Sequence, residues 1–339
     1  MKLRGVFLRL SLVAIGLLGG ALTLEFGLRC RTAFDNYRVE KADLGPKPTG
    51  TVQAGQIVRF SQNRKMVYDL RPNLDVEFMG AAVKTNSEGF RDRNHSLAKP
   101  PAVRRAVTLG DSYMFGWGVP VESGYVEVAA HALPKWEFIN LARPGYATAQ
   151  ELECFRVYGL KYDPDVVVLN YISNDTELPY YIQKAPTDLS SSFLKEWMDG
   201  RLRTDGLTNP APKFKDASKK FWTYEDDPQR VPSQYRDLVG WGAVERSFKE
   251  LAELGQQQDF RVVFFCFPHA DEKALQYARQ VGFDICDFTP QLQQLMQQRG
   301  LKDFYGSDLM LKPPDTHPSA LLHRAGGEFL AEYLKKHFP

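Results

Sequence analysis

The fold is indicated most clearly by the stretch Ala106-Val107-Thr108-Leu109-Gly110-Asp111-Ser112, in which a short apolar strand pattern runs into a Gly-Asp-Ser turn. Four more strand patterns follow, at Phe138–Leu141, Val166–Asn170, Val262–Phe267 and Phe283–Cys286. Strands that are apolar along their whole length and alternate with helices are typical of a parallel sheet covered on both faces. We therefore expect an α/β protein, a three-layer α/β/α sandwich with a mostly parallel five-stranded sheet.

Helical patterns fill the spaces between these strands. We expect an amphipathic helix at the C-terminus, and further helices over Tyr125–Leu133, Ala149–Leu160, Lys273–Val281 and Pro290–Gln298.

A large insertion interrupts the alternation over residues 183–242. It carries prolines, charges of both signs and no strong periodicity. Its aromatic residues are Trp197, Phe214, Phe221, Trp222, Tyr224 and Tyr235. A segment of this kind inside a compact fold is typical of a lid or a partner surface. We interpret residues 101–339 as one domain that contains this insertion.

The composition excludes several classes of protein. The chain has 339 residues, of which 43% are hydrophobic and 25% charged, so it is neither disordered as a whole nor a rod. Its net charge of +2 gives no support to a nucleic-acid partner. The four cysteines form no CxxC pair, and no HExxH motif occurs, so we expect no metal and no cofactor. A Cys266–Cys286 bridge is an open alternative to buried thiols.

The N-terminus has the pattern of an export segment. The apolar run Leu10–Leu24 follows three basic residues, Lys2, Arg4 and Arg9. A basic flank before an apolar run places the N-terminus in the cytoplasm and the rest of the chain in the periplasm or outside. We favour an uncleaved single-pass membrane anchor over residues 1–31, and a cleaved signal stays open. Residues 32–100 are interpreted as a stalk, over 32–60, and an accessory segment.

Two motifs far apart in the sequence suggest nucleophilic catalysis. Ser112 lies at the carboxyl end of the first strand, the edge at which ligands bind to such sheets. Near the C-terminus, His317 follows Asp315 by two residues, so an imidazole is available to take the serine proton while a carboxylate fixes its tautomer. A helix cap at Asp111 and Ser112, and a loop histidine at position 317, are the structural alternatives.

Donors for an oxyanion follow the next two strands. Gly145 follows the second strand and offers a backbone N–H, and Asn174 follows the third strand and offers a side-chain amide. Each alone also fits a turn. Four polar elements at strand ends in this order favour an acyl-transfer site.

These four blocks resemble those of the SGNH, or GDSL-type, hydrolase superfamily. In that family the blocks contribute a serine, a glycine, an asparagine and a histidine, which correspond here to Ser112, Gly145, Asn174 and His317. The resemblance implies an SGNH, flavodoxin-like fold with Asp315 as the triad acid. It also implies an oxyanion hole made by the Ser112 N–H, the Gly145 N–H and the Asn174 side chain. It covers the chain from about Arg104 onward, apart from the insertion.

Two positions depart from the family pattern. Ile172 stands where the third block usually has glycine, which affects the backbone bend beside Asn174. The acid often lies three residues before the histidine, whereas Asp315 lies two before it, so Asp308 is a reserve candidate for the acid.

The segment Asn86–Asp92 resembles a subgroup of membrane-anchored bacterial SGNH proteins associated with envelope polysaccharides. Asn86 and Arg91 are candidates for the mouth of the site, with a β-turn as the alternative. The resemblance implies an exported serine esterase that removes an acyl group, most simply O-acetyl, from a carbohydrate or envelope polymer. An O-acetyltransferase that uses the same acyl-serine, and a non-catalytic envelope scaffold, are the alternatives.

Overall fold

The centre of the molecule is a parallel sheet. The structure is a computed structural model and describes residues 2–43, 47–52, 54–178, 185–189, 192–198, 227–229, 231, 233–313 and 315–339. The five-stranded sheet has the order β10-β9-β8-β6-β7, and all neighbouring strands are parallel. Its strands are β6 (Arg104–Leu109), β7 (Trp136–Asn140), β8 (Val166–Leu169), β9 (Arg261–Cys266) and β10 (Asp284–Asp287). The expected α/β architecture with a mostly parallel five-stranded sheet is confirmed.

The strand order reverses beside β6. After β6 the chain moves outward to β7, then returns across β6 to β8 and continues to β9 and β10. Ligands bind to open α/β sheets at such a reversal, at the carboxyl ends of the strands. Ser112 follows β6 directly, so the topology places it at this point.

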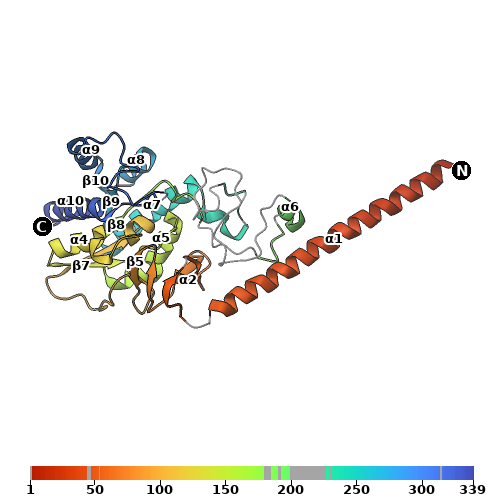
Figure 1. Ribbon diagram of the computed structural model, residues 1–339, viewed down its shortest axis with the longest axis horizontal. Helices are drawn as coiled ribbons and strands as arrows, with labels where there is room; N and C mark the ends of the chain where they lie inside the picture. The colour runs from red at the N-terminus through yellow and green to blue at the C-terminus, as the bar shows by residue number, and fades with distance from the viewer. Residues whose placement is uncertain are drawn as a thin grey trace.

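Helices cover both faces of the sheet (Figure 1). The helix pair α4 and α10 packs together on one face, and α5 and α7 pack together on the other, as right-handed crossovers require when the strand order reverses. The helices of this body are α3 (Ser112–Phe115), α4 (Tyr125–Ala132), α5 (Thr148–Cys154), α7 (Trp241–Gln258), α8 (Glu272–Gln280), α9 (Thr289–Gln298) and α10 (Ala320–His337).

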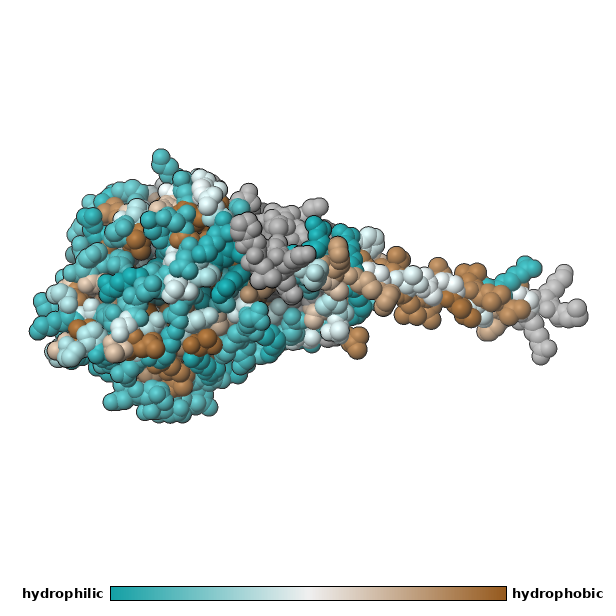
Figure 2. Space-filling model, turned by 90° about the horizontal axis from the view of Figure 1, so that it is seen from below, coloured by the Kyte–Doolittle hydropathy of each residue, from teal (hydrophilic) through white to brown (hydrophobic). Residues whose placement is uncertain are grey.

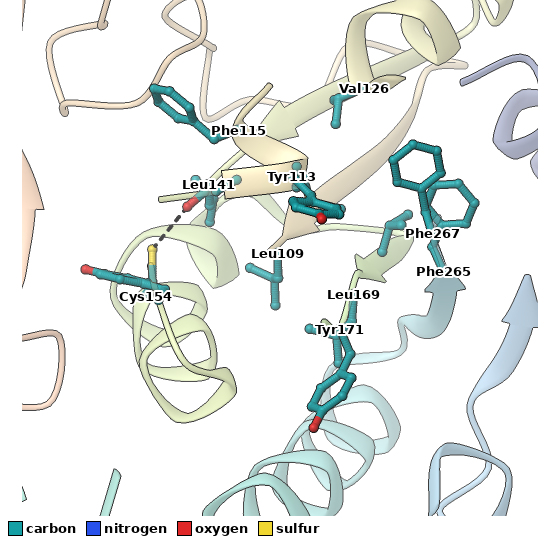
Figure 3. Packing of buried hydrophobic residues seen from close by; sticks show 14 of the residues in the cluster. Leu109, Tyr113, Phe115, Val126, Leu141, Cys154, Leu169, Tyr171, Phe265 and Phe267 are labelled. Carbon is teal, nitrogen blue, oxygen red and sulfur yellow. Dashed lines mark hydrogen bonds between the residues drawn. The ribbon is translucent and has the colours of Figure 1, made fainter. Parts of the chain in front are cut away.

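The core lies between the sheet and these helices. Val166, Val167 and Val168 of β8 are fully buried, because a central parallel strand is covered on both faces. Figure 3 shows part of this cluster, with Leu109 of β6, Leu169 of β8 and Phe265 of β9 among its members. Full burial of each such hydrophobic side chain contributes about 1.5–3 kcal/mol to the stability of the fold. The four cysteines are free thiols, so the Cys266–Cys286 bridge is absent.

The N-terminal helix is longer than the sequence suggested. Helix α1 runs from Lys2 to Asp43, beyond the expected end at residue 31. Residues 32–43 contain no glycine or proline, and the first helix breakers are Gly45 and Pro46. Within α1, Gly5–Arg38 is long and apolar enough to cross a membrane. The most apolar stretch of 18 residues in it has a mean hydropathy of 2.0, and none of its residues is buried. Figure 2 shows this helix as a largely hydrophobic projection from a more hydrophilic body.

The segment after α1 is folded, which corrects the expectation of a stalk over residues 32–60. It forms two small sheets that we call the accessory region, residues 50–84. One sheet has the order β1-β4-β5 and the other pairs β2 with β3. The elements are β1 (Gly50–Val52), α2 (Ala54–Ile57), β2 (Val58–Phe60), β3 (Tyr68–Leu70), β4 (Asp75–Phe78) and β5 (Ala81–Lys84). These strands have three or four residues, too few for a periodic pattern to be read from the sequence.

The insertion is described in part. It contains α6 (Phe193–Met198), and a 3₁₀ turn over Ser233–Leu238 buries Tyr235. Phe214, Phe221, Trp222 and Tyr224 lie outside the described residues, so their expected place in a lid or partner surface is untested.

Candidate active site

Ser112 is held at the junction of β6 and α3. Asp111 caps the short helix, and its Oδ1 accepts a hydrogen bond from the backbone N–H of Tyr113 at 3.0 Å. A side chain at Gly110 is excluded, because a Cβ there would lie 2.8 Å from the Cβ of Met114. Gly116 then ends the helix in the left-handed region, with a φ of 76°. Gly110 and Asp111 are therefore the residues that fit the tight turn presenting Ser112.

The structure brings Ser112, His317 and Asp315 together. His317 Nε2 lies 2.8 Å from Ser112 Oγ, and His317 Nδ1 lies 2.6 Å from Asp315 Oδ1. The backbone N–H of His317 also donates to Asp315 Oδ1, at 2.9 Å. Since an ionised carboxylate only accepts, Nδ1 carries the ring proton and Nε2 is free to accept the serine hydroxyl. This is the connectivity of a serine nucleophile, a base and an orienting acid.

Asp315 is kept ionised by its hydrogen bonds. Burial raises the pKa of Asp315, but the hydrogen bonds and charge of His317, together with the indole N–H of Trp117, outweigh burial and hold the pKa below its usual range. Asp308, the reserve candidate for the acid, pairs instead with Arg299 at 2.5 Å, and its side chain is 60% exposed. Asp315, and not Asp308, is therefore the carboxylate that lies beside His317.

Two aromatic residues that the sequence analysis did not assign frame the histidine. The Trp117 ring stacks on His317 with 4.8 Å between centroids, and its Nε1 donates to Asp315 Oδ2 at 3.0 Å. The Tyr113 hydroxyl donates to the carbonyl of Thr316 at 2.9 Å. Tyr113 and Trp117 follow Ser112 by one and five positions. These aromatic residues close after the serine were the signal in the sequence that could have indicated contacts with His317.

Asn174 reaches Asp111, the residue before the serine. It follows β8 and is buried, and its Nδ2 donates to Asp111 Oδ2 at 3.3 Å. Ser112 Oγ lies 3.1 Å from the same Asp111 oxygen. An amide has two N–H donors, so a second donor of Asn174 stays available beside the serine.

Gly145 lies on a buried loop that joins β7 to α5. Its φ of 78° is in the left-handed region, where glycine is favoured. The loop is attached to the end of β6, since Arg143 N donates to the Gly110 carbonyl at 3.2 Å. The structure therefore brings the segment that carries Gly145 next to the Gly-Asp-Ser turn.

The accessory region supports this loop. The Tyr68 hydroxyl donates to the carbonyl of Pro144, and the Tyr146 hydroxyl donates to the carbonyl of Tyr68. Arg143 is fully buried and lies 3.1 Å from Asp69. Sequence reasoning did not find this support, because nothing in the short β3 pattern indicates which loop it contacts.

Asn86 and Arg91 do not line the mouth of the site, so that expectation is corrected. Arg91 is buried and donates to the backbone carbonyls of Ala82, Phe115, Gly116 and Val119, so it ties the accessory region to the end of α3. Asn86 Oδ1 accepts from the backbone N–H groups of Glu88 and Phe90, in the turn that the alternative reading described.

Three carboxyl groups are buried near the loops that carry Gly145 and Asn174: Asp111, Glu151 and Asp175. Thr148 Oγ1 donates to Asp175 Oδ2 at 3.2 Å, which ties the start of α5 to the Asn174 loop. Burial, followed by the charges of Asp175 and Asp111, raises the pKa of Glu151 well above its usual range. The buried site therefore favours the neutral form of Glu151. In the part of the chain that the structure describes, no group of three His, Cys, Asp or Glu side chains is arranged to hold a metal ion.

No protein-family model and no curated protein match the chain. Among solved structures it is similar to an acetyl xylan esterase, with 14% identity over 68% of this chain and 99% of that chain, at a TM-score of 0.41. It is also similar to a member of the lipolytic G-D-S-L family from Veillonella parvula, with 15% identity over 70% and 98% of the chains and a TM-score of 0.39. A lipase/acylhydrolase from Enterococcus faecalis has 15% identity over 69% and 96%, with a TM-score of 0.37. One of these three structures carries the G-D-S-L name.

Proposed function

We propose that this protein is a serine esterase of the SGNH type, which removes an acyl group, O-acetyl in the simplest case, from a carbohydrate or envelope polymer. The observation that carries the proposal is the continuous contact from Ser112 Oγ through both ring nitrogens of His317 to Asp315. A serine that only capped a helix would not need an oriented imidazole on its hydroxyl. For the same reason we disfavour a non-catalytic scaffold.

The reaction begins with the hydroxyl of Ser112. Its oxygen attacks the ester carbonyl carbon while its proton moves to His317 Nε2. The negative charge that develops on the carbonyl oxygen is stabilised by the N–H groups of Ser112 and Gly145 and by the amide of Asn174. The C–O bond to the alcohol then breaks, and His317 returns the proton to the leaving oxygen.

The second half of the reaction removes the acyl group from Ser112. A water molecule loses its proton to His317 and attacks the acyl carbonyl, and the serine leaves with that proton restored. A sugar hydroxyl in place of water would give O-acetyl transfer through the same acyl-serine. The products therefore distinguish hydrolysis from transfer.

We place the catalytic body outside the cytoplasm, attached through α1. The apolar part of α1 follows a basic N-terminal flank, and the site residues belong to the body beyond Asp43. A retained helix gives an attached enzyme, and cleavage of this helix would give a secreted one. Mass analysis of the mature protein separates the two.

The test is turnover of a chromogenic acetyl ester and release of acetate from acetylated polysaccharides. Ser112→Ala should abolish turnover of both. Ser319→Ala is the matched control, since its hydroxyl donates to the Asp308 carbonyl close to His317 but outside the site. An S112A variant that keeps wild-type turnover would contradict the proposal.

A further inference from the structure

The short helix α6 of the insertion is fixed to the N-terminal helix by a carboxylate. Glu25 of α1 accepts hydrogen bonds from the backbone N–H groups of Phe193, at 3.1 Å, and Leu194, at 2.7 Å. It also accepts from the hydroxyl of Ser192 at 3.0 Å. The first N–H groups of a helix have no partner within the helix. The hydroxyl of Ser192 accepts from the backbone N–H of Lys195 at 3.2 Å, and Glu25 accepts from the two N–H groups before it, so both residues cap α6.

Arg29, one helical turn further along α1, holds a second piece of the insertion. Its guanidinium donates to the carbonyls of Pro186 and Asp188, each at 2.8 Å. It also lies over the ring of Phe193, at 4.3 Å from the centroid, and pairs with Glu25 at 2.7 Å. The insertion is thus attached to α1 by charge-assisted hydrogen bonds at the start of α6 and in the segment before it, and Figure 1 shows α6 beside α1, outside the α/β body.

The attachment lies at the end of the apolar run. Glu25 is the first residue after Leu10–Leu24, so a bilayer that contains this run has its surface close to Glu25. The helix continues for eighteen more residues to Asp43, which is about 27 Å at 1.5 Å per residue. The body therefore starts well away from this surface, and the insertion reaches back along α1 to meet it.

Large apolar side chains surround this attachment and face solvent. Leu189 is 87% exposed, Trp197 54% and Met198 70%. Leu189 directly follows Asp188, which Arg29 binds, and the other two residues end α6. On α1 itself, Phe26 beside the cap is also exposed. Tryptophan is enriched where a membrane meets water, because its ring is apolar and its N–H is polar.

We propose that Leu189, Trp197 and Met198 insert into the interfacial layer of the leaflet from which α1 emerges. These side chains belong to segments that Arg29 and Glu25 hold against α1, whose own apolar side chains are exposed, and this adjacency identifies lipid as the occupant. The proposal rests on the attachment of α1 to a membrane stated above. A single helix lets the body rotate about its axis, whereas a second contact at the surface fixes the orientation of the active site relative to the membrane.

The experiment uses the full-length chain in vesicles of phosphatidylcholine and phosphatidylglycerol, with and without phospholipids brominated on their acyl chains. Bromine quenches tryptophan fluorescence at contact distance. We expect brominated lipid to quench part of the wild-type emission and expect this quenched part to fall in Trp197→Phe. Trp136→Phe is the matched control, since Trp136 lies on β7 in the body, and it should leave the quenched part unchanged.

Flotation and quenching together distinguish the surface contact from the membrane anchor. A chain that floats with the vesicles while W197F keeps the wild-type quenching would overturn the surface contact and leave the anchor in place. A chain that does not float would overturn both the anchor and the contact. Hydrolysis of a soluble ester by the same vesicles tests the chemistry separately, and W197F should not change it because Trp197 lies outside the site.

Discussion

The two halves of the active site are held in different ways. The nucleophile half, made of Ser112, His317 and Asp315, is positioned by contacts within and between two short motifs. The oxyanion half depends on the loop that carries Gly145, and this loop is supported by Tyr68 and its neighbours in the accessory region. Both halves thus depend on contacts between distant parts of the sequence. The triad residues contact one another directly, whereas the Gly145 loop is held by a separate region of the chain, residues 50–84.

The largest expected effect belongs to the nucleophile half. Ser112→Ala and His317→Ala should each lower kcat by about 10⁴ or more, because the groups act as a unit. For the same reason the double variant should be little worse than either single one. Initial rates on a chromogenic acetyl ester measure this. If the two losses multiplied in the double variant, the two residues would act independently and the triad would be wrong.

A smaller loss is expected from the oxyanion half. Asn174→Ala should lower kcat by about 10²–10³, the usual effect of removing one oxyanion donor. KM should change little, because the interaction strengthens in the transition state rather than in the ground state. Separate kcat and KM values test the role. A rise in KM at constant kcat would assign Asn174 to substrate binding instead.

The support of the Gly145 loop should have a still smaller effect. Tyr68→Phe removes the donor to the Pro144 carbonyl, and a lost loop constraint of about 1.4 kcal/mol would lower kcat about tenfold. Tyr162→Phe is the matched control, since it removes a hydroxyl that donates to Glu88 away from the site. The kinetics of both variants should be measured beside their thermal stability. Equal kcat values in the two variants would show that the accessory region stabilises the fold without tuning the site.

The smallest kinetic effect is expected at Glu151. Glu151→Gln should keep kcat within about twofold, because burial favours the neutral carboxyl and glutamine has nearly the same shape. The stability of this variant should depend less on pH than that of the wild type. With a folded pKa raised above the unfolded one, the wild type loses stability as pH rises above the ordinary carboxyl range, by up to about 1.4 kcal/mol per pH unit until the folded pKa is reached.

Thermal unfolding of the wild type and E151Q at pH 5 and pH 8 measures this difference. The variant should lose less stability than the wild type between the two values. Equal losses would mean that Glu151 is ionised in the folded protein.

Much of the fold could be predicted because the sheet is buried on both faces. The central parts of the strands are mostly apolar, and the strand ends lie within two residues of the expected positions at β6 and β7. The accessory region could not be predicted, since its strands are short and lie beside glycines and prolines that suggested a stalk. The end of α1 was placed too early because the apolar run, rather than the first helix breaker, was taken as its limit.

The candidate site was also predicted only in part from the sequence. The motifs were sufficient to name the residues that meet at Ser112, because each motif carries its own turn. Trp117 was not assigned, since its contact with His317 joins positions 200 residues apart. Arg91 was assigned to the mouth of the site because a charged residue in a turn pattern gives no indication that it will be buried against backbone carbonyls.

The most direct test of the central claim is covalent labelling of the nucleophile. The full-length protein is treated with a fluorophosphonate, digested and analysed by mass spectrometry. We predict one adduct, on the peptide that contains Ser112, with labelling lost in His317→Ala and slowed in Asn174→Ala. An adduct on another serine, or labelling of Ser112 at an unchanged rate without His317, would contradict the account.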